Sequence, residues 1–235
     1  MSNKNHCETL AKRLTENLNS ETFLINEKFY NGSKSKTTPS GWLYVTDSNE
    51  PNHVRYILGE PKEHNALLIG LNPNNGIPQK TDSSMQYAVE KILRSKPKYQ
   101  DIGWIVINLY PWRSKAVPGT FEYLSEEYYQ HNLEVIRSLK EACHGTRTLD
   151  LIWAAWGDSI ELSSYFVFTM MSIIHEFGGE EWEDKWKSSG ELTKKGHPVH
   201  PSYLSRKRCN KRPFKRFDIA NYVNLMKRRY PNIAL

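Results

Sequence analysis

The chain has 235 residues, of which 38% are hydrophobic and 25% are charged, and its formal net charge is +6. No apolar run approaches the roughly 20 residues that a membrane span needs, the first residues lack the apolar centre of a signal peptide, and three widely spaced cysteines argue against a disulfide framework. The length fits one large domain with a sizeable core. We therefore expect a monomeric, cytoplasmic protein that forms a single domain over residues 1–235.

The positive charge is concentrated at the C-terminal end. Residues 194–235 hold twelve lysines and arginines and one acid, Asp218, so this block carries +11. The rest of the chain then holds 20 basic and 25 acidic residues, which gives −5. A basic block on an otherwise acidic protein favours a surface that binds the phosphate backbone of a nucleic acid. The alternative is a solvated helical face.

Residues 1–60 predict an N-terminal extension that packs on the main domain. Leucines at a four-residue spacing predict a helix over residues 5–30. Residues 41–45 and 53–58 predict two strands of a hairpin, because a polar turn separates two short apolar runs.

The remaining residues alternate short apolar runs with helical patterns. Strands are predicted over 66–70, 104–108 and 149–157, with a weaker one within 182–192, and helices over 82–95, 121–143, 159–177 and 217–229. Thr81 or Asp82 could cap the first of these helices, and Asp158 the third. This order predicts an α/β fold with three layers, in which helices cover both faces of a central, mostly parallel, four-stranded sheet.

Four polar segments follow the predicted strands, and we expect them to meet at the carboxyl edge of the sheet, where ligands bind in such folds. They are Gly70-Leu-Asn-Pro, Asn108 with Leu-Tyr-Pro, Trp156-Gly-Asp, and His197-Pro-Val-His-Pro-Ser202. Two histidines without a nearby third ligand make a metal site a weak prediction, and prolines 198 and 201 exclude a regular helix there. We expect neither a metal nor another cofactor.

A buried asparagine at a strand end has a specific chemical use. The carboxamide of Asn108 offers donors and an acceptor, which match the edge of a nucleobase. The alternative for Asn108 is a structural role in holding the next loop. His200 could likewise be a turn residue between two prolines, and the aromatic Tyr110 could stack on a base or pack in the core.

Taken in order, these segments resemble the motifs of the uracil-DNA glycosylase superfamily. Gly70-Leu-Asn-Pro is similar to the first motif, in the Gly-x-Asn-Pro form of the mismatch-specific branch. Val106-Ile-Asn108 resembles the strand whose last residue recognises the base, and Trp156-Gly157 resembles the strand end before the last motif. His200-Pro-Ser-Tyr-Leu-Ser205 resembles the loop that carries the catalytic histidine and enters the minor groove.

The resemblance spans residues 66–225, because the segment from Phe214 to Val223 is similar to the helix after that loop. More narrowly, Thr193-Lys-Lys-Gly-His-Pro-Val-His-Pro resembles an uncharacterised bacterial and phage branch.

This resemblance implies an enzyme that hydrolyses the N-glycosidic bond of a flipped, damaged, mismatched or modified pyrimidine in double- or single-stranded DNA. It implies that Asn72 and His200 are catalytic and that Leu204 wedges into the DNA. The implied substrate-binding residues are Gly70, Leu71, Asn74, Asn108, Tyr110 and Ser202. The implied DNA-binding residues are Lys194, Lys195, Leu204, Ser205, Arg206, Lys207, Arg208, Lys211 and Arg212.

Three departures from the family pattern bear on this expectation. Asn72 stands where the main uracil enzymes have a water-activating aspartate, and an asparagine can position water but cannot take its proton. Asn74 replaces an aromatic residue that closes the pocket against a 5-methyl group, which leaves room for a larger pyrimidine. The cysteines do not match the branches that bind an iron–sulfur cluster.

Two alternatives stay open, and the lack of a carboxylate at position 72 favours the first. One is a non-catalytic reader of modified or single-stranded nucleic acid. The other is an N-glycosidase that acts on free nucleosides or nucleotides and has little need of the basic C-terminal block.

Overall fold

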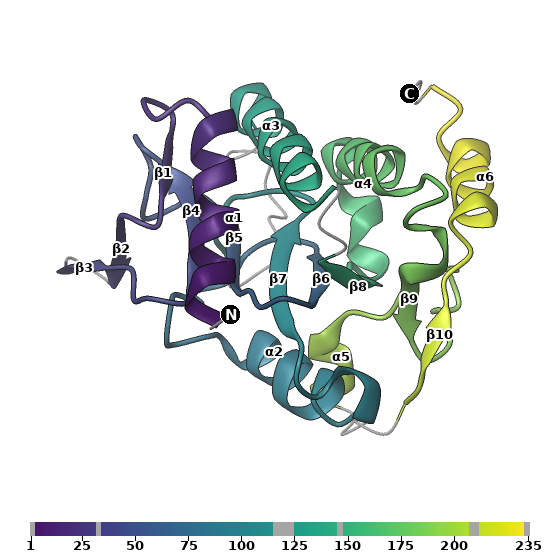
Figure 1. The fold of residues 1–235 in the computed structure, drawn as a ribbon. Coiled ribbons are helices and arrows are strands. Elements are labelled where there is room, and N and C mark those ends of the chain that lie inside the picture. The colour runs from purple at the N-terminus through teal and green to yellow at the C-terminus, as the bar shows by residue number, and fades with distance from the viewer. Residues whose placement is uncertain (1–2, 32–33, 115–124, 145–147, 207–211, 233–235) are drawn as a thin grey trace.

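The computed structural model describes residues 3–31, 34–114, 125–144, 148–206 and 212–232. Its centre is an eight-stranded mixed sheet in the order β1-β4-β5-β7-β6-β8-β9-β10 (Figure 1). These strands are β1 (Phe23–Ile25), β4 (Leu43–Asp47), β5 (Arg55–Glu60), β6 (Asn65–Gly70), β7 (Gly103–Asn108), β8 (Leu149–Ala154), β9 (Trp186–Ser189) and β10 (Phe214–Arg216). A separate hairpin pairs β2 (Lys28–Asn31) with β3 (Lys34–Thr37).

The α/β class is confirmed, but the prediction of a four-stranded, mostly parallel sheet was wrong. Strands β7, β6, β8 and β9 are adjacent and parallel, whereas the four other pairings in the sheet are antiparallel. The predicted hairpin of β4 and β5 does form, but β5 pairs with β7 and thereby joins the main sheet. Part of the expected N-terminal extension is therefore integral to the sheet.

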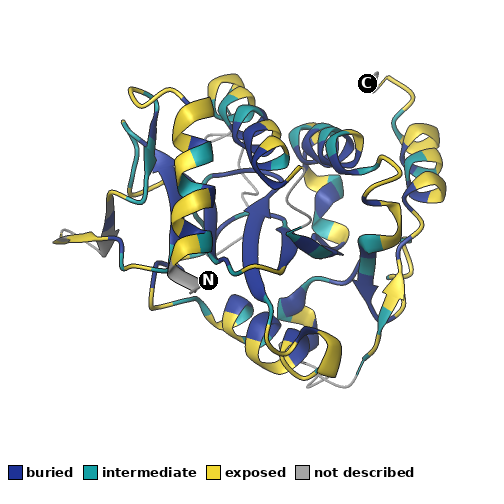
Figure 2. Cartoon of the chain, viewed as in Figure 1, coloured by how far each residue is buried: buried dark blue, intermediate teal, exposed yellow. Residues whose placement is uncertain are grey.

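Helices cover both faces of this sheet and bury it (Figures 1 and 2). One face packs against α1 (Asn3–Asn17), α3 (Glu126–Cys143), α4 (Ser164–Phe177) and α6 (Ile219–Arg229). The other face packs against α5 (Pro201–Arg206) and α2 (Ser83–Gln86), which continues as a π-helix over Tyr87–Leu93.

Alternating residues of the parallel strands supply the two cores. Along β6, Leu67 and Ile69 belong to the core under α1, α3 and α4, whereas Ala66 and Leu68 belong to the core over α2 and α5. This alternation follows from the period-two geometry of a strand. Because both faces are apolar, each central strand reads as a continuous hydrophobic run.

Several predicted element boundaries shift. The helix expected over 5–30 ends at Asn17, and β1 and β2 follow it. Helix α4 begins only at Ser164, because Ser163 caps it while Asp158 starts a separate 3-10 turn. Asp82 caps α2 as predicted. Helix α6 lies within the predicted range and is capped by Asp218. The start of the helix predicted over 121–143 lies outside the described residues.

The segment after His200 is helical, contrary to the prediction. Helix α5 starts at Pro201. A proline fits at the first position of a helix, because its missing N–H would have no partner within the helix. Among the described residues, no helix has the length and apolar character needed to cross a membrane.

Candidate active site at the carboxyl ends of the parallel strands

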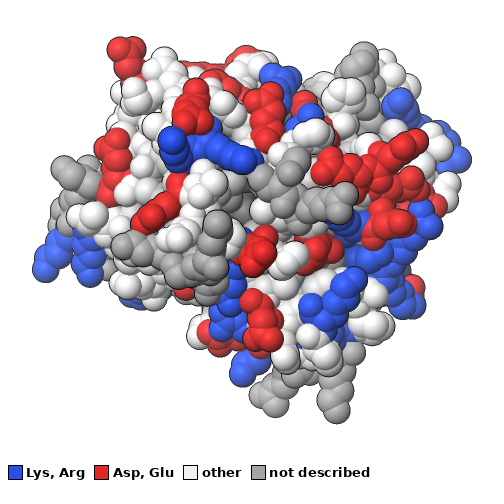
Figure 3. Space-filling view, viewed as in Figure 1, with Lys and Arg blue, Asp and Glu red and all other residues white. Residues whose placement is uncertain are grey.

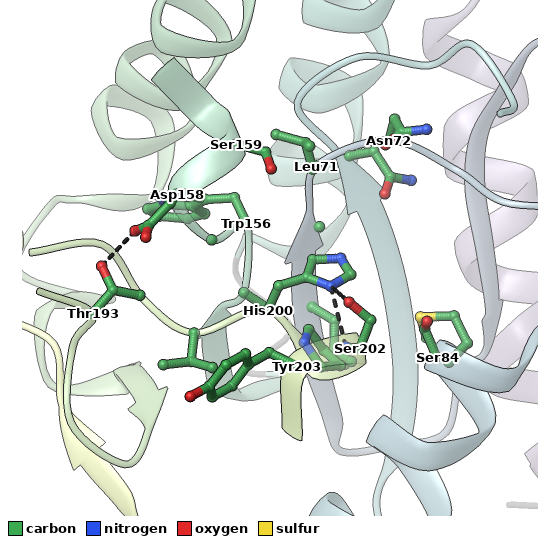
Figure 4. A pocket seen from close by; sticks show the side chains of 18 of the residues that line it. Leu71, Asn72, Ser84, Trp156, Asp158, Ser159, Thr193, His200, Ser202 and Tyr203 are labelled. Carbon is green, nitrogen blue, oxygen red and sulfur yellow. Dashed lines mark hydrogen bonds between the residues drawn. The ribbon is translucent and has the colours of Figure 1, made fainter. Parts of the chain in front are cut away.

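A cavity of about 1100 Å³ lies where the parallel strands end. Leu68, Val106 and Ala155 contribute apolar lining from β6, β7 and the end of β8. Polar side chains converge on the same space from the loops after these strands, from the start of α2 and from α5 (Figure 4). The cavity is as large as the sites that bind drug-sized molecules. The predicted site residues among its lining are Gly70, Leu71, Asn72, Asn74, Asn108, Lys194, His200, Ser202 and Arg212.

Asn108 is the last residue of β7. It lines this cavity and is only 4% exposed. Its Nδ2 has no hydrogen-bond partner among the described residues. A Cβ atom on Gly70 would lie 2.7 Å from the Asn108 Oδ1, so the absence of a side chain at Gly70 makes room for the carboxamide. A buried amide that the protein leaves unpaired is costly and calls for an explanation.

The backbone around Asn108 is held by a second asparagine that the sequence analysis did not identify. Asn132 of α3 is 1% exposed, and its Nδ2 donates to the carbonyl oxygens of Asn108 (3.0 Å) and Leu109 (3.4 Å). Its place on an otherwise apolar helical face was the only sequence signal for this role. The two asparagines therefore differ, because one has its donor satisfied and the other has not.

His200 is oriented by the first turn of α5. Its Nδ1 lies 2.8 Å from the Ser202 Oγ and accepts from the Ser202 backbone N–H at 3.2 Å. The ring projects into the cavity, and its other nitrogen is turned away from Ser202 (Figure 4). Because a backbone N–H can only donate, Nδ1 must accept, and the proton of a neutral imidazole then sits on Nε2.

Gly157 sets the path of the chain beside His200. Its φ of +75° favours glycine, and a Cβ there would lie 3.0 Å from the His200 Cβ. Its N–H also donates to the Pro198 carbonyl at 2.9 Å. The Trp-Gly strand end is thus in direct contact with the His-Pro-Ser segment.

His197, the other histidine of the motif, lies outside the cavity lining and is fully buried. Its Nδ1 is 2.6 Å from the Tyr222 hydroxyl, and its Nε2 is 2.9 Å from Glu161. Tyr222 in turn accepts from the Trp156 indole at 2.9 Å. Burial lowers the pKa of His197 below its ordinary value. This histidine is therefore linked to Trp156 through Tyr222 and does not line the cavity.

Asn72 is fixed by the loops around it. Its Nδ2 donates to the carbonyl oxygens of Pro73 (3.3 Å) and Ser114 (3.2 Å). These bonds use the donor end of the carboxamide, so its oxygen is the end available to a ligand or a water. A carboxylate at this position would present an acceptor to two carbonyl oxygens, which explains why an amide suits this site better than aspartate.

Three of the predicted contact residues do not line the cavity. Tyr110 is fully buried outside the cavity, where it packs against Phe166 and its hydroxyl accepts from the Ser125 N–H. Leu204 is fully buried in the core over α2. Lys195 forms an ion pair with Glu161 at 2.6 Å and does not line the cavity.

Helical geometry explains the position of Leu204. Successive residues of a helix point about 100° apart, so α5 turns Leu204 inward and Tyr203 outward. Tyr203 is 46% exposed and lines the cavity, as does Leu192, which is 43% exposed. These are two of the three large apolar side chains that are exposed among the described residues.

The basic block is partly neutralised by acidic residues from other parts of the chain. Arg229 contacts Glu161, Arg216 contacts Glu183 and Lys215 contacts Glu191. Acidic and basic side chains accordingly lie side by side over β9, β10 and α6 (Figure 3). Lys194, Arg212 and Lys215 still line the cavity. The candidates Lys207, Arg208 and Lys211 lie outside the described residues, and Ser205 and Arg206 are described only as the last residues of α5.

Arg55 and Ser84 also line the cavity, although the sequence analysis did not single them out. No group of three or more His, Cys, Asp or Glu residues that could hold a metal ion occurs within the described ranges.

Comparison with known proteins gives one match. Residues 55–202 match a family described as "Protein of unknown function (DUF1643)". No curated protein and no solved structure is significantly similar to the chain. The matched segment begins at Arg55 and ends at Ser202, both of which line the cavity, and it contains Asn72, Asn108 and His200. Because this segment covers well over half of the sequence, the chain belongs to the DUF1643 family.

Proposed function

We propose that the protein is a DNA glycosylase that hydrolyses the N-glycosidic bond of a pyrimidine flipped out of DNA. The observation that carries this proposal is the unpaired amide nitrogen, Nδ2, of Asn108, a residue that is 4% exposed beside a cavity of about 1100 Å³. A base that entered the cavity would supply the missing acceptor for Nδ2. Such a reaction needs the nucleotide outside the stack, since its glycosidic bond is unreachable within a duplex.

His200 supplies a proton donor for the leaving base. With Nδ1 accepting from Ser202, the proton of a neutral imidazole is on Nε2, and in the proposed complex this N–H donates to an oxygen of the base. Negative charge develops on this oxygen as the bond to the sugar breaks. A donor already in place for such charge contributes about 3–4 kcal/mol to the lowering of the barrier.

Asn72 orients the attacking water through its free carbonyl oxygen, since its amide protons are bound to Pro73 and Ser114. It takes no proton, so the barrier is lowered mainly by stabilising the leaving base. General-base catalysis is ordinarily worth about 10²–10⁴-fold in rate. We therefore expect slow turnover compared with enzymes that have an aspartate at this position.

Basic residues of the cavity lining provide the DNA contacts. Lys194, Arg212 and Lys215 line the cavity and would contact phosphates, Lys215 in exchange for its ion pair with Glu191. The exposed side chain of Tyr203 replaces Leu204 as the group that stacks into the gap left by the flipped base. Its exposed position in the cavity lining supports this role.

One observation favours a second function, that of a non-catalytic reader of a flipped or modified base. The cavity would bind the base as described above, but Asn72 offers no general base at the expected position. This function predicts tight, selective binding of DNA without hydrolysis of the N-glycosidic bond.

A strand-cleavage assay separates the two functions. Labelled duplexes and single strands that contain uracil, a thymine mismatch or a modified pyrimidine are incubated with an excess of protein and then treated with alkali. Breaks at the target base support the enzyme, and selective retention without breaks supports the reader. Asn108→Ala serves as the control, because it should lose base selectivity while keeping salt-dependent DNA binding. Breaks of equal yield and selectivity with this variant would contradict the proposal.

A further inference from the structure

Arg55 is a buried cation in the wall of the cavity. It is the first residue of β5, it is 1% exposed, and it lines the cavity together with Asn74 and Ser84. Its Nη1 donates to the Gly76 carbonyl at 2.6 Å, and its Nε has no hydrogen-bond partner among the described residues. Burial lowers the pKa of Arg55 to about 10, so the guanidinium is still charged at neutral pH.

The protein supplies this cation with little compensating charge. Within the described residues no carboxylate lies within 4.0 Å of Arg55. Asp82, which also lines the cavity, attracts Arg55 without forming an ion pair with it: its Oδ1 accepts the N–H groups of Ser84 and Met85, and its Oδ2 and the Arg55 Nη1 both lie next to Gly76. Arg113 adds a second positive charge nearby. A buried charge without a close partner is strongly destabilising, which indicates that the site is built for a group that arrives from outside.

A second unpaired polar group lies beside the guanidinium. The hydroxyl of Tyr44, a residue that is 1% exposed, has no partner among the described residues, and it interacts electrostatically with both Arg55 and Arg113. Around Arg55, hydrogen-bond donors and positive charges therefore outnumber hydrogen-bond acceptors.

The position of Arg55 limits where the anion can come from. Because Arg55 is 1% exposed and lines the cavity, a ligand could reach it through the cavity and not from the outer surface. The backbone phosphates of a bound duplex stay outside and are contacted by Lys194, Arg212 and Lys215. The anion must therefore belong to the part of the ligand that enters, and a cavity of about 1100 Å³ has room for a base with a large substituent or for a whole nucleotide.

We infer that Arg55 is the anion-recognition residue of the cavity, and that the ligand carries an oxyanion on the part that enters. The planar guanidinium group matches the geometry of a carboxylate or a phosphate, and such charge-assisted hydrogen bonds are stronger than hydrogen bonds between neutral groups. The inference rests on the proposed function in taking the entering part to be a nucleotide. Two sources supply the oxyanion: an acidic substituent on a flipped base, or the phosphate of a free nucleotide.

Matched pairs of ligands test this inference by calorimetry and by thermal shift of the full chain. The first pair is 5-carboxycytosine and cytosine in otherwise identical oligonucleotides, and the second is dCMP and deoxycytidine. We expect the anionic member of at least one pair to bind about 10- to 100-fold more tightly, as hydrogen bonds to charged groups allow. A preference in the first pair identifies an acidic base, and a preference in the second identifies a free nucleotide.

Three variants localise the effect. Arg55→Gln should abolish the preference, and Arg55→Lys should retain part of it. Arg113→Gln removes the same charge from a residue that does not line the cavity, so it should reduce the preference much less than Arg55→Gln does. If Arg55→Gln does not fold by circular dichroism, the wild-type pairs and Arg55→Lys still decide the question.

Equal binding within both pairs, no binding of any anionic ligand, or a preference that survives Arg55→Gln would overturn the inference. The outcome is separable from that of the proposed function. Anion preference without base release from DNA would refute only the glycosylase proposal, and base release without anion preference would refute only the role of Arg55.

Discussion

Replacement of Asn108 by alanine should impair function without lowering stability. An amide buried without a hydrogen bond destabilises a protein by about 1–3 kcal/mol, and the Asn108 Nδ2 is such a group. Truncation removes that penalty, and the space it opens joins the existing cavity instead of forming a new enclosed void. The loss of packing opposes this gain, so we expect the free energy of unfolding to stay within about 1 kcal/mol of wild type, or a melting temperature within about 2–4 °C.

Asn132→Ala is the matched control. The same substitution one element away removes the donor to the carbonyl oxygens of Asn108 and Leu109 inside the core. Unsatisfied buried acceptors should lower the free energy of unfolding by about 1–3 kcal/mol. Thermal melts followed by circular dichroism compare the two variants, and single-turnover base release compares their activity.

We expect the two variants to differ in opposite ways in their melting temperature and their rate of base release. Asn108→Ala keeps its melting temperature but releases base about 10- to 100-fold more slowly, because a bond worth 1–3 kcal/mol to the base is lost. Asn132→Ala melts earlier. If Asn108→Ala melted as early as Asn132→Ala and retained full base selectivity, Asn108 would be a structural asparagine that does not recognise the base.

The remaining predictions concern the surroundings of the cavity. Gly157→Ala should slow base release, with a loss of about 1–2 kcal/mol in stability, because it combines an unfavourable φ with a contact to the His200 Cβ; unchanged kinetics would contradict this. Leu204→Ala should lower the free energy of unfolding by about 2–5 kcal/mol, because Leu204 is fully buried. Tyr203→Ala should leave the free energy of unfolding in chemical denaturation unchanged and should weaken DNA binding in a titration. The reverse pattern would make Leu204 the residue that inserts into the DNA. Hydrogen bonds from Lys195 and His197 lower the pKa of Glu161 to about 2 from 4.5, so its stabilising contribution is present above pH 4.5 and lost toward pH 2. Glu161→Gln should therefore lower the melting temperature at pH 6 and have little effect near pH 2, and an equal effect at both would refute the role of this carboxylate.

Much of the fold could be predicted because the central strands carry strong signals. β6 and β7 are continuous apolar runs that end in turn residues, which places Gly70 and Asn108 at one edge of the sheet. Strands β1 and β10 have three residues each, too few for a period-two pattern to be recognised. The pairing of β5 with β7 depends on long-range packing, which a local pattern does not contain.

The candidate site was predictable only in part for similar reasons. Motif residues that follow strands were placed correctly, since the strand ends determine where they meet. The phase of Leu204 and Tyr203 depended on whether residues 201–206 form a loop or a helix. Arg55 escaped notice because a charged residue at a strand start is usually exposed, and only the packed structure shows it 1% exposed beside the cavity.

The most direct test of the proposed function is base release measured by mass spectrometry on a panel of natural and phage-modified DNAs, with the protein in excess over target sites. We predict a free pyrimidine from at least one DNA, with alkali-sensitive sites in equal number, and a 10- to 100-fold slower release by Asn108→Ala. Absence of free base from every DNA, or equal release by Asn108→Ala, would contradict the account.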